Sequence, residues 1–502
     1  MPPQPQLIDA FSIDHLHADL KGRSVRGGLL TLTSQGTTFV VQSVATVVLA
    51  RLLMPADFGL VAMVTAITGL GQAFSDLGLS EATIQRPEIS HKQVSNLFWV
   101  NVAVGLTLML ITVALAPALA WFYREPRLKG ITLVTSLIFL ISGLRVQHNA
   151  LLQRQMRFVS LAIRDVAASV VAVPIAIVMA WHGAGYWAIV ALPLILNFTA
   201  VVITWFMVKW IPGLPRRGAQ IGSMIAFGGK VAASYVIINV NRSADAVLTG
   251  WYWGAGPLGL YSRAYNLLML PVRQLSGPAG SVAIPAFSRI QNDPERFARY
   301  YLRAVNLVVW ISAPMFAFLF VAAQPVIVLV LGKKWQAAAP VFQILIIASL
   351  GQLLFETILW LFVSRGQSGR LFKLLLVISP IIVASFAVGL PFGIKGVALS
   401  GSLVFIGMFP WILKYTFRGT QLTLKHLGQA MVCPVAACFV GAIFSELALH
   451  VVAPQRLGPQ FLVVTLGFVA AALLLALVPP IRTEVLSLRN LSKELRLSGD
   501  AI

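Results

Sequence analysis

Four basic side chains stand inside stretches of the chain that are otherwise apolar enough to cross a membrane. Lys230 and Arg242 lie in one such stretch, and Arg263 and Arg273 lie in the next. A cation at the centre of a bilayer costs about 2.5–3.5 kcal/mol on insertion scales, so such residues normally face a water-filled cavity or an anion. The planar guanidinium of arginine suits phosphate oxygens, to which it can donate two parallel hydrogen bonds. These residues predict a passage for a negatively charged group, with Arg273, the deepest cation, as its first contact.

The stretch that contains Lys230 and Arg242 also carries a polar stripe. Its members recur at helical spacing and share one face of a helix; they are Lys230, Ser234, Asn241, Asp245 and Thr249. Arg242 lies beside this stripe, one helical turn from Asp245, and the two side chains can pair. One interpretation is an ion pair that holds this helix to a neighbour. The other is a charged cavity wall in which Asp245 limits the positive field.

Neutral polar side chains form a second pattern near the N-terminus. Gln35, Thr38 and Gln42 follow one face of the first long apolar run, and Gln72 lies in the second run. Amides and hydroxyls in such rows can hydrogen-bond to sugar hydroxyls, or they can join neighbouring membrane helices. Arg145, near the end of a later run, either contacts the same anionic group or reaches the membrane surface.

The composition is that of a membrane protein. Of the 502 residues, 58% are hydrophobic and only 11% are charged, which no soluble globular domain requires. The net charge of +21 arises mainly between the apolar runs, so it indicates membrane topology and contact with anionic lipid rather than with nucleic acid. Cys433 and Cys438 share one apolar run, which favours simple packing over a disulfide or a zinc site.

Fourteen apolar runs, among them 130–151, 186–208 and 257–285, meet the length of about 20 residues that a membrane-spanning helix needs. The predicted fold class is an all-α polytopic membrane protein. Lysine and arginine are concentrated in alternate loops on the side of the N-terminus, so both termini are predicted to be cytoplasmic. The predicted parts are a cytoplasmic amphipathic segment (1–28), a first lobe (29–208), a cytoplasmic linker (209–222), a second lobe (223–416), two further spans (417–481) and a cytoplasmic tail (482–502).

A short internal repeat supports two lobes. Residues 58–61 (FGLV) and 258–261 (LGLY) both enter a span directly after a turn that contains a proline, Pro55 or Pro257. Both copies follow the first helix of a six-helix unit, and the two units run in the same sense through the membrane. Such units are related by an axis along the membrane normal, with a cleft between them. The first, second, seventh and eighth spans are therefore expected to line the cleft.

Motifs for catalysis are missing from the sequence. It contains no Walker A loop, no H-E-x-x-H and no G-x-S-x-G motif, and it has no Cys/His cluster for a metal. All loops are too short to hold a catalytic domain. We therefore expect a protein that is not an enzyme and that uses no cofactor and no metal.

Two segments carry a resemblance to a known family. Residues 51–59 (RLLMPADFG) resemble the R-x-L-x-P-x-D/E-[FY]-G hairpin of bacterial polysaccharide flippases. Asp245, Gly250 and residues 258–265 (LGLYSRAY), followed by Pro271, are similar to the signature of the seventh and eighth spans in that family. The chain thus resembles Wzx-type polysaccharide transporters of the multidrug/oligosaccharidyl-lipid/polysaccharide exporter superfamily, and most of all their colanic-acid exporter branch.

The resemblance implies a function. Members of this family move isoprenoid-diphosphate-linked oligosaccharides across the bacterial inner membrane by alternating access, for exopolysaccharide or lipopolysaccharide synthesis. It implies that Arg273, Arg263, Arg242 and Lys230, with Arg145, attract the anionic part of the substrate. Gln35, Thr38, Gln42, Gln72 and Asn241 would then line the cavity for neutral hydroxyls. Membrane lipids are implied partners, and a polysaccharide polymerase and a chain-length regulator are further candidates.

Related exporters use cation gradients, which require a carboxylate that titrates. The candidates here are Asp76, Asp245 and Glu356, although Glu356 also suits a neutral, hydrogen-bonded role in the middle of the membrane. The alternative function is a cation-coupled multidrug antiporter of the same superfamily, which would need an acidic cavity; the excess of Lys and Arg in the seventh and eighth spans disfavours it. A membrane polymerase would need a larger outer loop, and a scaffold role is disfavoured by the short loops.

Overall fold

The computed structural model describes residues 20–76, 78–86, 88–215, 243–452, 454 and 456–476, and this part of the chain is helical, without a β-strand. Eight helical stretches in it are long and apolar enough to cross a membrane. The predicted all-α polytopic fold is confirmed, and the protein is a multi-pass membrane protein. The number of fourteen spans stays a prediction. Most of the amphipathic segment 1–28 and the whole tail 482–502 lie outside the described residues.

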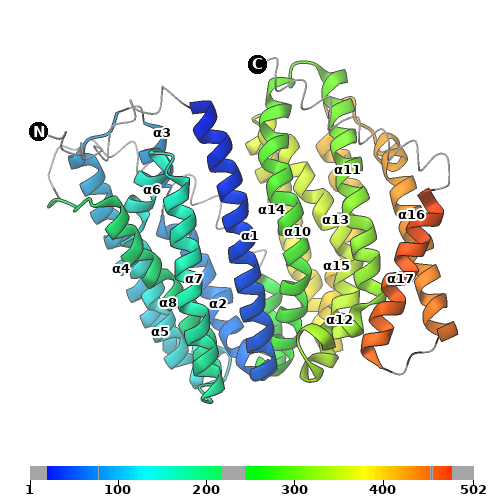
Figure 1. Cartoon of the computed structure of the whole chain (residues 1–502), viewed down its shortest axis with the longest axis horizontal. Helices are drawn as coiled ribbons and strands as arrows, with labels where there is room; N and C mark the ends of the chain where they lie inside the picture. Colours follow the sequence, from blue (N-terminus) through cyan, green and yellow to red (C-terminus); the bar gives the residue numbers. More distant parts are fainter. Residues whose placement is uncertain are drawn as a thin grey trace, which may run out of the picture. The chain divides into compact units, whose positions relative to one another are not determined.

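The chain folds as two compact units, Met1–Gly259 and Leu260–Ile502. The lobes expected at 29–208 and 223–416 remain a prediction. The first unit is coloured blue to green in Figure 1. Its helices are α1 (Leu20–Leu52), α2 (Pro55–Ser75), α3 (Leu79–Gln85), α4 (His91–Phe122), α5 (Arg127–Gly143), α6 (Val146–Arg154), α7 (Phe158–Trp181) and α8 (Tyr186–Val208). A further helical segment, residues 243–253, precedes α10.

Local sequence explains where the helices of the first unit begin. Pro55 occupies the first turn of α2, where a missing N–H costs nothing, and the Asp57 carboxylate accepts a hydrogen bond of 2.9 Å from the Met54 N–H. At the start of α4, Ser90 and Gln93 exchange hydrogen bonds between side chain and backbone. Both arrangements satisfy N–H groups that a helix start leaves without a partner.

The span predicted at 130–151 is divided into two helices. α5 ends at Gly143, and α6 begins at Val146 after a turn at Leu144 and Arg145. Gly143 packs directly on α4, because a Cβ atom there would lie 2.7 Å from the carbonyl oxygen of Asn101. The short helices α3 and α6 pack against each other beside this break.

The segment that follows α8 is hydrogen-bonded to the start of α4. The indole N–H of Trp99 donates to the Gly213 carbonyl (2.9 Å), and the Gly213 N–H donates to the Ser95 hydroxyl (3.0 Å). The indole of Trp210 donates to Nδ1 of His91 (3.0 Å). The first residues of the predicted linker 209–222 therefore belong to the first unit.

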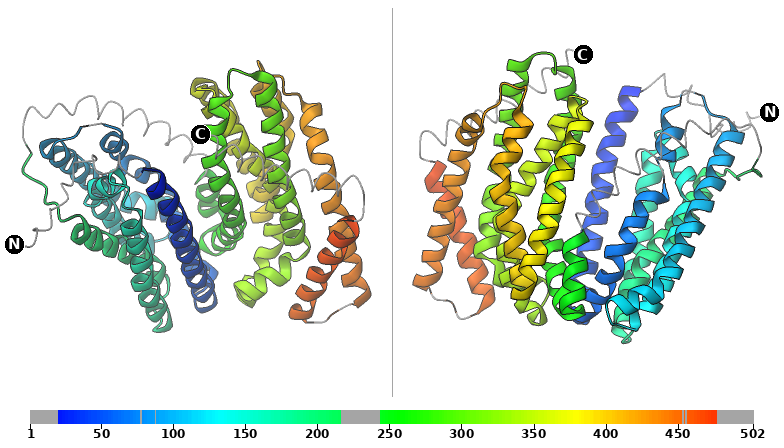
Figure 2. Two further views of the ribbon diagram at one scale, coloured as in Figure 1. Left: turned by 45° about the horizontal axis from the view of Figure 1, so that its top comes forward. Right: turned by 180° about the vertical axis from the view of Figure 1, so that it is seen from behind.

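The second unit contains most of α10 (Ala255–Arg289). The other helices are α11 (Pro294–Val321), α12 (Ala323–Val330), the 3₁₀ turn η2 (Lys333–Ala338), α13 (Ala339–Ser364), α14 (Ser368–Gly389), the 3₁₀ turn η3 (Leu390–Phe392), α15 (Gly393–Phe417), α16 (Leu424–Val452) and α17 (Leu457–Ala476). α16 and α17 form a hairpin at the edge of this unit, where α16 packs on α11 and α17 packs on α12 (Figure 2).

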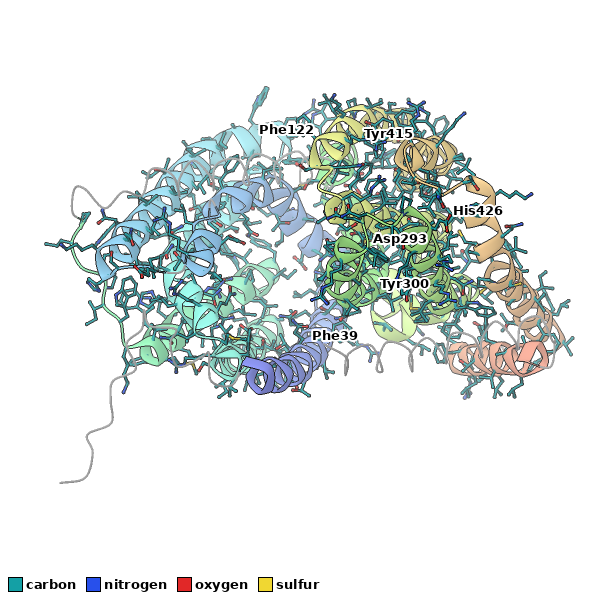
Figure 3. All side chains as sticks on the ribbon, turned by 90° about the horizontal axis from the view of Figure 1, so that it is seen from above. Phe39, Phe122, Asp293, Tyr300, Tyr415 and His426 are labelled. Carbon is teal, nitrogen blue, oxygen red and sulfur yellow. The ribbon has the colours of Figure 1, made fainter. Side chains whose placement is uncertain are left out.

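Helix ends in the second unit follow the same rules. Asp293, labelled in Figure 3, caps α11 by accepting a hydrogen bond of 3.0 Å from the Arg296 N–H. The view along the helices shows side chains filling the interior of the second unit between the labelled Tyr300 of α11 and the labelled Tyr415 of α15. Outward-facing apolar residues are frequent in both units, including Trp121 and Trp181 near helix ends. Tryptophan at such positions suits the boundary between lipid and water.

Candidate functional site

The two glutamines of the polar stripe on α1 are exposed rather than packed. Gln35 and Gln42 are exposed, Thr38 is half-buried, and Gln72 on α2 is exposed. None of the four side chains hydrogen-bonds to another residue in the described part of the chain. Within those residues, no hydrogen bond supports the interpretation in which these side chains join neighbouring helices. An open row of amides is available to a ligand.

A buried chain of hydrogen bonds fixes the break between α5 and α6. The Thr83 hydroxyl donates to the Gln147 side-chain oxygen (2.8 Å), and the Gln147 amide donates to the Asn101 side-chain oxygen (2.9 Å). The Asn101 amide in turn donates to the carbonyl of Asp76 (3.3 Å). Thr83, Gln147 and Asn101 are fully buried. Buried polar groups are stabilising only when they are paired in this way, so this network sets the positions of α3 and α6.

Asp76, a candidate for ion coupling, lies at the junction of α2 and α3. Its carboxylate accepts a hydrogen bond of 3.0 Å from the Ser80 N–H and a second, short one from the Ser80 hydroxyl. A carboxylate at the start of a helix is favoured by the exposed N–H groups there. The sequence did not indicate this contact, which gives Asp76 a structural role at the start of α3.

Two arginines meet near the break. Arg145 directly precedes the first residue of α6 and is half-buried, and its guanidinium donates no hydrogen bond within the described part of the chain. The charges that act on it are those of Arg164 and Asp165. Arg164, on α7, is buried and donates to the Asn149 side-chain oxygen and to Asp165 (2.7 Å). Arg164 was not among the predicted site residues, although an arginine near the start of the long apolar helix α7 could have indicated it.

Two other arginines donate to carbonyls at helix C-termini instead. Arg154 is 5% exposed and donates to the carbonyls of Thr83 (3.1 Å) and Arg86 at the end of α3. In the second unit, Arg370 donates to the carbonyls of Tyr415 (2.9 Å) and Arg418 (3.2 Å) at the end of α15. Helix C-termini leave carbonyls without partners and attract cations. These arginines are not available to a substrate.

The basic residues of α10 differ in their surroundings. Arg273 is exposed, and its side chain makes no hydrogen bond or ion pair within the described part of the chain; Arg263 is half-buried. Glu356, on α13, is also half-buried. Asp245 is buried in segment 243–253, where its carboxylate accepts a hydrogen bond of 2.7 Å from the Ala246 N–H. Lys230, Asn241 and Arg242 lie outside the described residues.

The second unit contains a cavity of about 910 Å³ between α12, α13, α16 and α17. Its polar lining includes Gln324, Gln336, Gln343 and Glu446, and none of the predicted site residues lines it. No lysine or arginine is among the lining residues. It therefore lacks the positive charge that an anionic substrate needs, and it is distinct from the predicted site.

Comparisons with known proteins relate the chain to proteins of polysaccharide biosynthesis. The sequence profile of a family described as polysaccharide biosynthesis protein matches residues 48–340, more than half of the chain. The lipopolysaccharide biosynthesis protein WzxC of Escherichia coli (strain K12) is 28% identical over 60% of this chain and 62% of its own length. The teichuronic acid biosynthesis protein TuaB of Bacillus subtilis (strain 168) is 24% identical over 73% of this chain and 77% of its own.

Among solved structures, the lipid II flippase MurJ in an inward closed conformation superposes with a TM-score of 0.71. The alignment covers 89% of this chain and 99% of that protein, at 14% sequence identity. At this level of identity the likeness concerns the fold. Less than two thirds of the length of WzxC is matched.

Proposed function

The chain belongs to the polysaccharide biosynthesis protein family, and on that premise we propose that it is a flippase for a lipid-linked oligosaccharide. Its substrate is an isoprenoid diphosphate that carries an oligosaccharide repeat unit. The protein moves it from the inner to the outer leaflet of the bacterial inner membrane, for exopolysaccharide or lipopolysaccharide synthesis. The names of WzxC, TuaB and MurJ support this class of substrate.

One observation carries the proposal. Arg273 is exposed inside the long apolar helix α10, with no hydrogen bond or ion pair in the described part of the chain. A cation in this position is costly unless water or an anion meets it. A diphosphate satisfies this requirement, because it accepts bidentate hydrogen bonds from guanidinium. Arg263 and Arg145 are further contacts in the proposal, and Lys230 and Arg242 complete the predicted set.

The oligosaccharide head needs a different lining. Its hydroxyls lose their hydrogen bonds to water if they enter hydrocarbon, which prevents spontaneous crossing. The exposed amides of Gln35, Gln42 and Gln72 offer replacement partners, as does Asn241 in the predicted set. The isoprenoid chain remains in the bilayer throughout. Binding must stay moderate, since a trapped anion cannot leave, and Asp245 limits the positive charge.

The test of the anion contact is Arg273→Ala in a strain that lacks the chromosomal gene. Loss of a charge-assisted hydrogen bond of about 1.5–3 kcal/mol should reduce surface polysaccharide about tenfold or more, with the amount of membrane protein unchanged. The matched control is Arg289→Ala, because Arg289 is an exposed arginine in the last turn of the same helix. Equal polysaccharide from both variants would contradict the proposal. A loss of protein from the membrane would assign Arg273 a structural role.

Coupling to a proton gradient is tested on the three carboxyl groups. Asp76→Asn, Asp245→Asn and Glu356→Gln each imitate the protonated form and remove the titration. At the coupling position the variant should transport at a rate that no longer varies with external pH, whereas the other two should keep the pH profile of the unsubstituted protein. The measurement is transport of labelled lipid-linked oligosaccharide into the lumenal leaflet of inverted vesicles, which corresponds to the outer leaflet in the cell. Three unchanged profiles would exclude proton coupling through these groups.

The proposal includes an inner-membrane location with both termini in the cytoplasm, and partners in the same pathway. Membrane lipids, a polysaccharide polymerase and a chain-length regulator are the expected partners, and nucleic acid is not. The multidrug antiporter alternative predicts drug sensitivity in a deletion strain. The basic residues of α10 disfavour it, because a cationic drug would be repelled there.

A further inference from the structure

The cavity of about 910 Å³ in the second unit lies where four helices end or begin. α11 ends at Val321, α13 begins at Ala339, α16 ends at Val452 and α17 begins at Leu457, and these ends gather at the lower end of the unit in Figure 1. The ends of membrane-spanning helices lie near the boundary between lipid and water. The cavity is therefore expected at the level of lipid head groups, and its volume suits a small ligand.

Two glutamines of the lining offer hydrogen-bond acceptors. The side-chain amide of Gln343 donates to the carbonyl of Phe320 (3.0 Å), and that of Gln460 donates to the carbonyl of Pro454 (3.0 Å). Because only the NH₂ group of an amide can donate, these bonds fix which way each side chain is turned. The side-chain oxygen of each glutamine accepts no hydrogen bond within the described part of the chain. Both oxygens are therefore available to a donor on a ligand.

An acidic side chain lines the same cavity. Glu446, on α16, is exposed, and its carboxylate lies 3.9 Å from Nε2 of His450, which is too far for a hydrogen bond. Gln324 and Gln336 add two amides that make no hydrogen bond within the residues that the structure describes. No lysine or arginine is among the lining residues. Such a lining favours a ligand group that donates hydrogen bonds and carries positive charge.

Two cations from different elements flank the cavity. Lys333 and Gln336 are three residues apart in the 3₁₀ turn η2, where side chains at this spacing share one side. The Gln460 N–H donates to the carbonyl of Arg456 (3.1 Å), so Arg456 stands one helical turn from Gln460. Both basic side chains are exposed, and neither makes a hydrogen bond or ion pair within the described part of the chain. The cavity thus has an acidic interior and basic edges.

We propose that this cavity binds a phospholipid whose head group carries a primary ammonium, as in phosphatidylethanolamine. The three N–H groups of the ammonium donate to the Glu446 carboxylate and to the side-chain oxygens of Gln343 and Gln460. The phosphate lies toward Lys333 and Arg456, whose charges attract it. The inference does not depend on the proposed transport function, because binding of this lipid requires no transport substrate.

The apolar part of the lining suits the rest of the lipid and excludes a choline head group. Phe320 and Ile443 line the cavity and are exposed, so they offer a surface to acyl chains. A quaternary ammonium has no N–H to donate and is normally bound by several aromatic rings. Phe320 is the only phenylalanine, tyrosine or tryptophan among the lining residues that the structure describes. Phosphatidylcholine should therefore bind more weakly.

Lipid retention by the purified full-length protein tests the proposal. The protein in detergent receives equal amounts of phosphatidylethanolamine and phosphatidylcholine with identical acyl chains, and native mass spectrometry measures how much of each stays bound. Hydrogen bonds from the ammonium to a carboxylate should favour phosphatidylethanolamine about tenfold. Equal retention of the two lipids by the unsubstituted protein would overturn the proposal.

Variants test whether the preference arises at this cavity. Glu446→Gln keeps the size of the side chain but removes its charge, and it should abolish the preference. The matched control is Glu295→Gln, an exposed glutamate at the other end of α11, which should keep it. Lys333→Ala should weaken both lipids equally, because both carry a phosphate, whereas Lys395→Ala, at an exposed lysine outside the lining, should not. An unchanged preference in Glu446→Gln would contradict the assignment to this cavity.

A soluble compound separates a lipid from a free amine as the ligand. Phosphoethanolamine carries the same ammonium and phosphate without acyl chains. It should displace bound phosphatidylethanolamine only at a large molar excess, because it lacks the contacts with the apolar lining. Displacement at a concentration equal to that of the lipid would assign the cavity to a soluble amine and overturn the proposed lipid.

Discussion

Arginine serves two different purposes in this protein, and burial alone does not separate them. Arg154 is almost fully buried, yet Nη1 of its guanidinium donates to carbonyls at the end of α3. Arg145 is half-buried and donates no hydrogen bond within the described part of the chain. We therefore propose that a binding arginine is one whose guanidinium makes no hydrogen bond to the described part of the chain, as is the case for Arg145. A guanidinium with free donors remains available for phosphate.

This distinction predicts opposite phenotypes for two nearby substitutions. Arg154→Ala should lower the free energy of unfolding by about 1.5–3 kcal/mol, because it leaves buried carbonyls without a charged donor. Arg145→Ala should leave stability nearly unchanged and should reduce transport. Thermal unfolding in detergent and surface polysaccharide in a deletion strain measure the two effects. Similar stability losses for both variants would place Arg145 among the structural residues.

Sequence analysis could find charges in unusual places but could not assign their partners. The basic residues of α10 stand out because hydrocarbon makes them costly. Arg164 and the contact between Asp76 and Ser80 escaped notice, since each depends on which side chains meet after folding. Periodicity reports which face of a helix a residue occupies, and it says nothing about what lies opposite. The predicted site therefore stays a prediction for its residues, although the polar stripe of α1 is exposed as a cavity lining requires.

At the scale of helices, both units use the same turn. Between α6 and α7, the N–H groups of Met156 and Arg157 donate to the carbonyls of Gln153 and Leu152, and Met156 has φ of 52°. Between α13 and α14, Gly366 and Gln367 make the corresponding bonds, and Gly366 has φ of 65°. This is the usual left-handed helix end, where glycine is favoured. The second unit has the favoured glycine at this position, Gly366, whereas the first unit has Met156.

The two turns therefore predict stability changes of opposite sign. Gly366→Ala should destabilise the protein by about 1–2 kcal/mol, because a left-handed backbone crowds the added Cβ. Met156→Gly should stabilise it by up to about 1 kcal/mol, since it removes the same crowding. Melting temperatures of the purified variants test both. A fall in stability for Met156→Gly would show that the side chain of Met156 contributes packing that outweighs its backbone strain.

Helix boundaries were largely readable from the apolar runs. The run at 186–208 matches α8 (Tyr186–Val208), and the run at 257–285 lies within α10 (Ala255–Arg289). Hydrophobicity sets these limits because the bilayer demands a minimum length. The run at 130–151 concealed the break at Leu144 and Arg145, beside which a buried hydrogen-bond network joins α6 to α3 and α4. Such a network forms between distant segments and leaves no local signal.

At the scale of the whole molecule, the distribution of basic residues is expected to fix the direction in which every span crosses the membrane. Reporter fusions test this proposal. Alkaline phosphatase fused after Lys334 should be active, because the reporter would lie outside the cytoplasm, whereas fusions after Arg289 and Arg418 should be inactive. Fluorescent protein fused at the same three positions should give the reverse pattern. The same activity at all three positions would contradict the predicted alternation.

Arg154 and Arg370, which bind helix ends, lie between predicted spans and therefore also belong to this expected topological signal. Insertion machinery counts positive charge, for which lysine is as good as arginine. At the end of α15, two nitrogens of the Arg370 guanidinium donate to the carbonyls of Tyr415 and Arg418, and the single ammonium of lysine supplies such a pair less well. Arg370→Lys should therefore leave the direction of the membrane spans unchanged and weaken the hydrogen bonds at the end of α15.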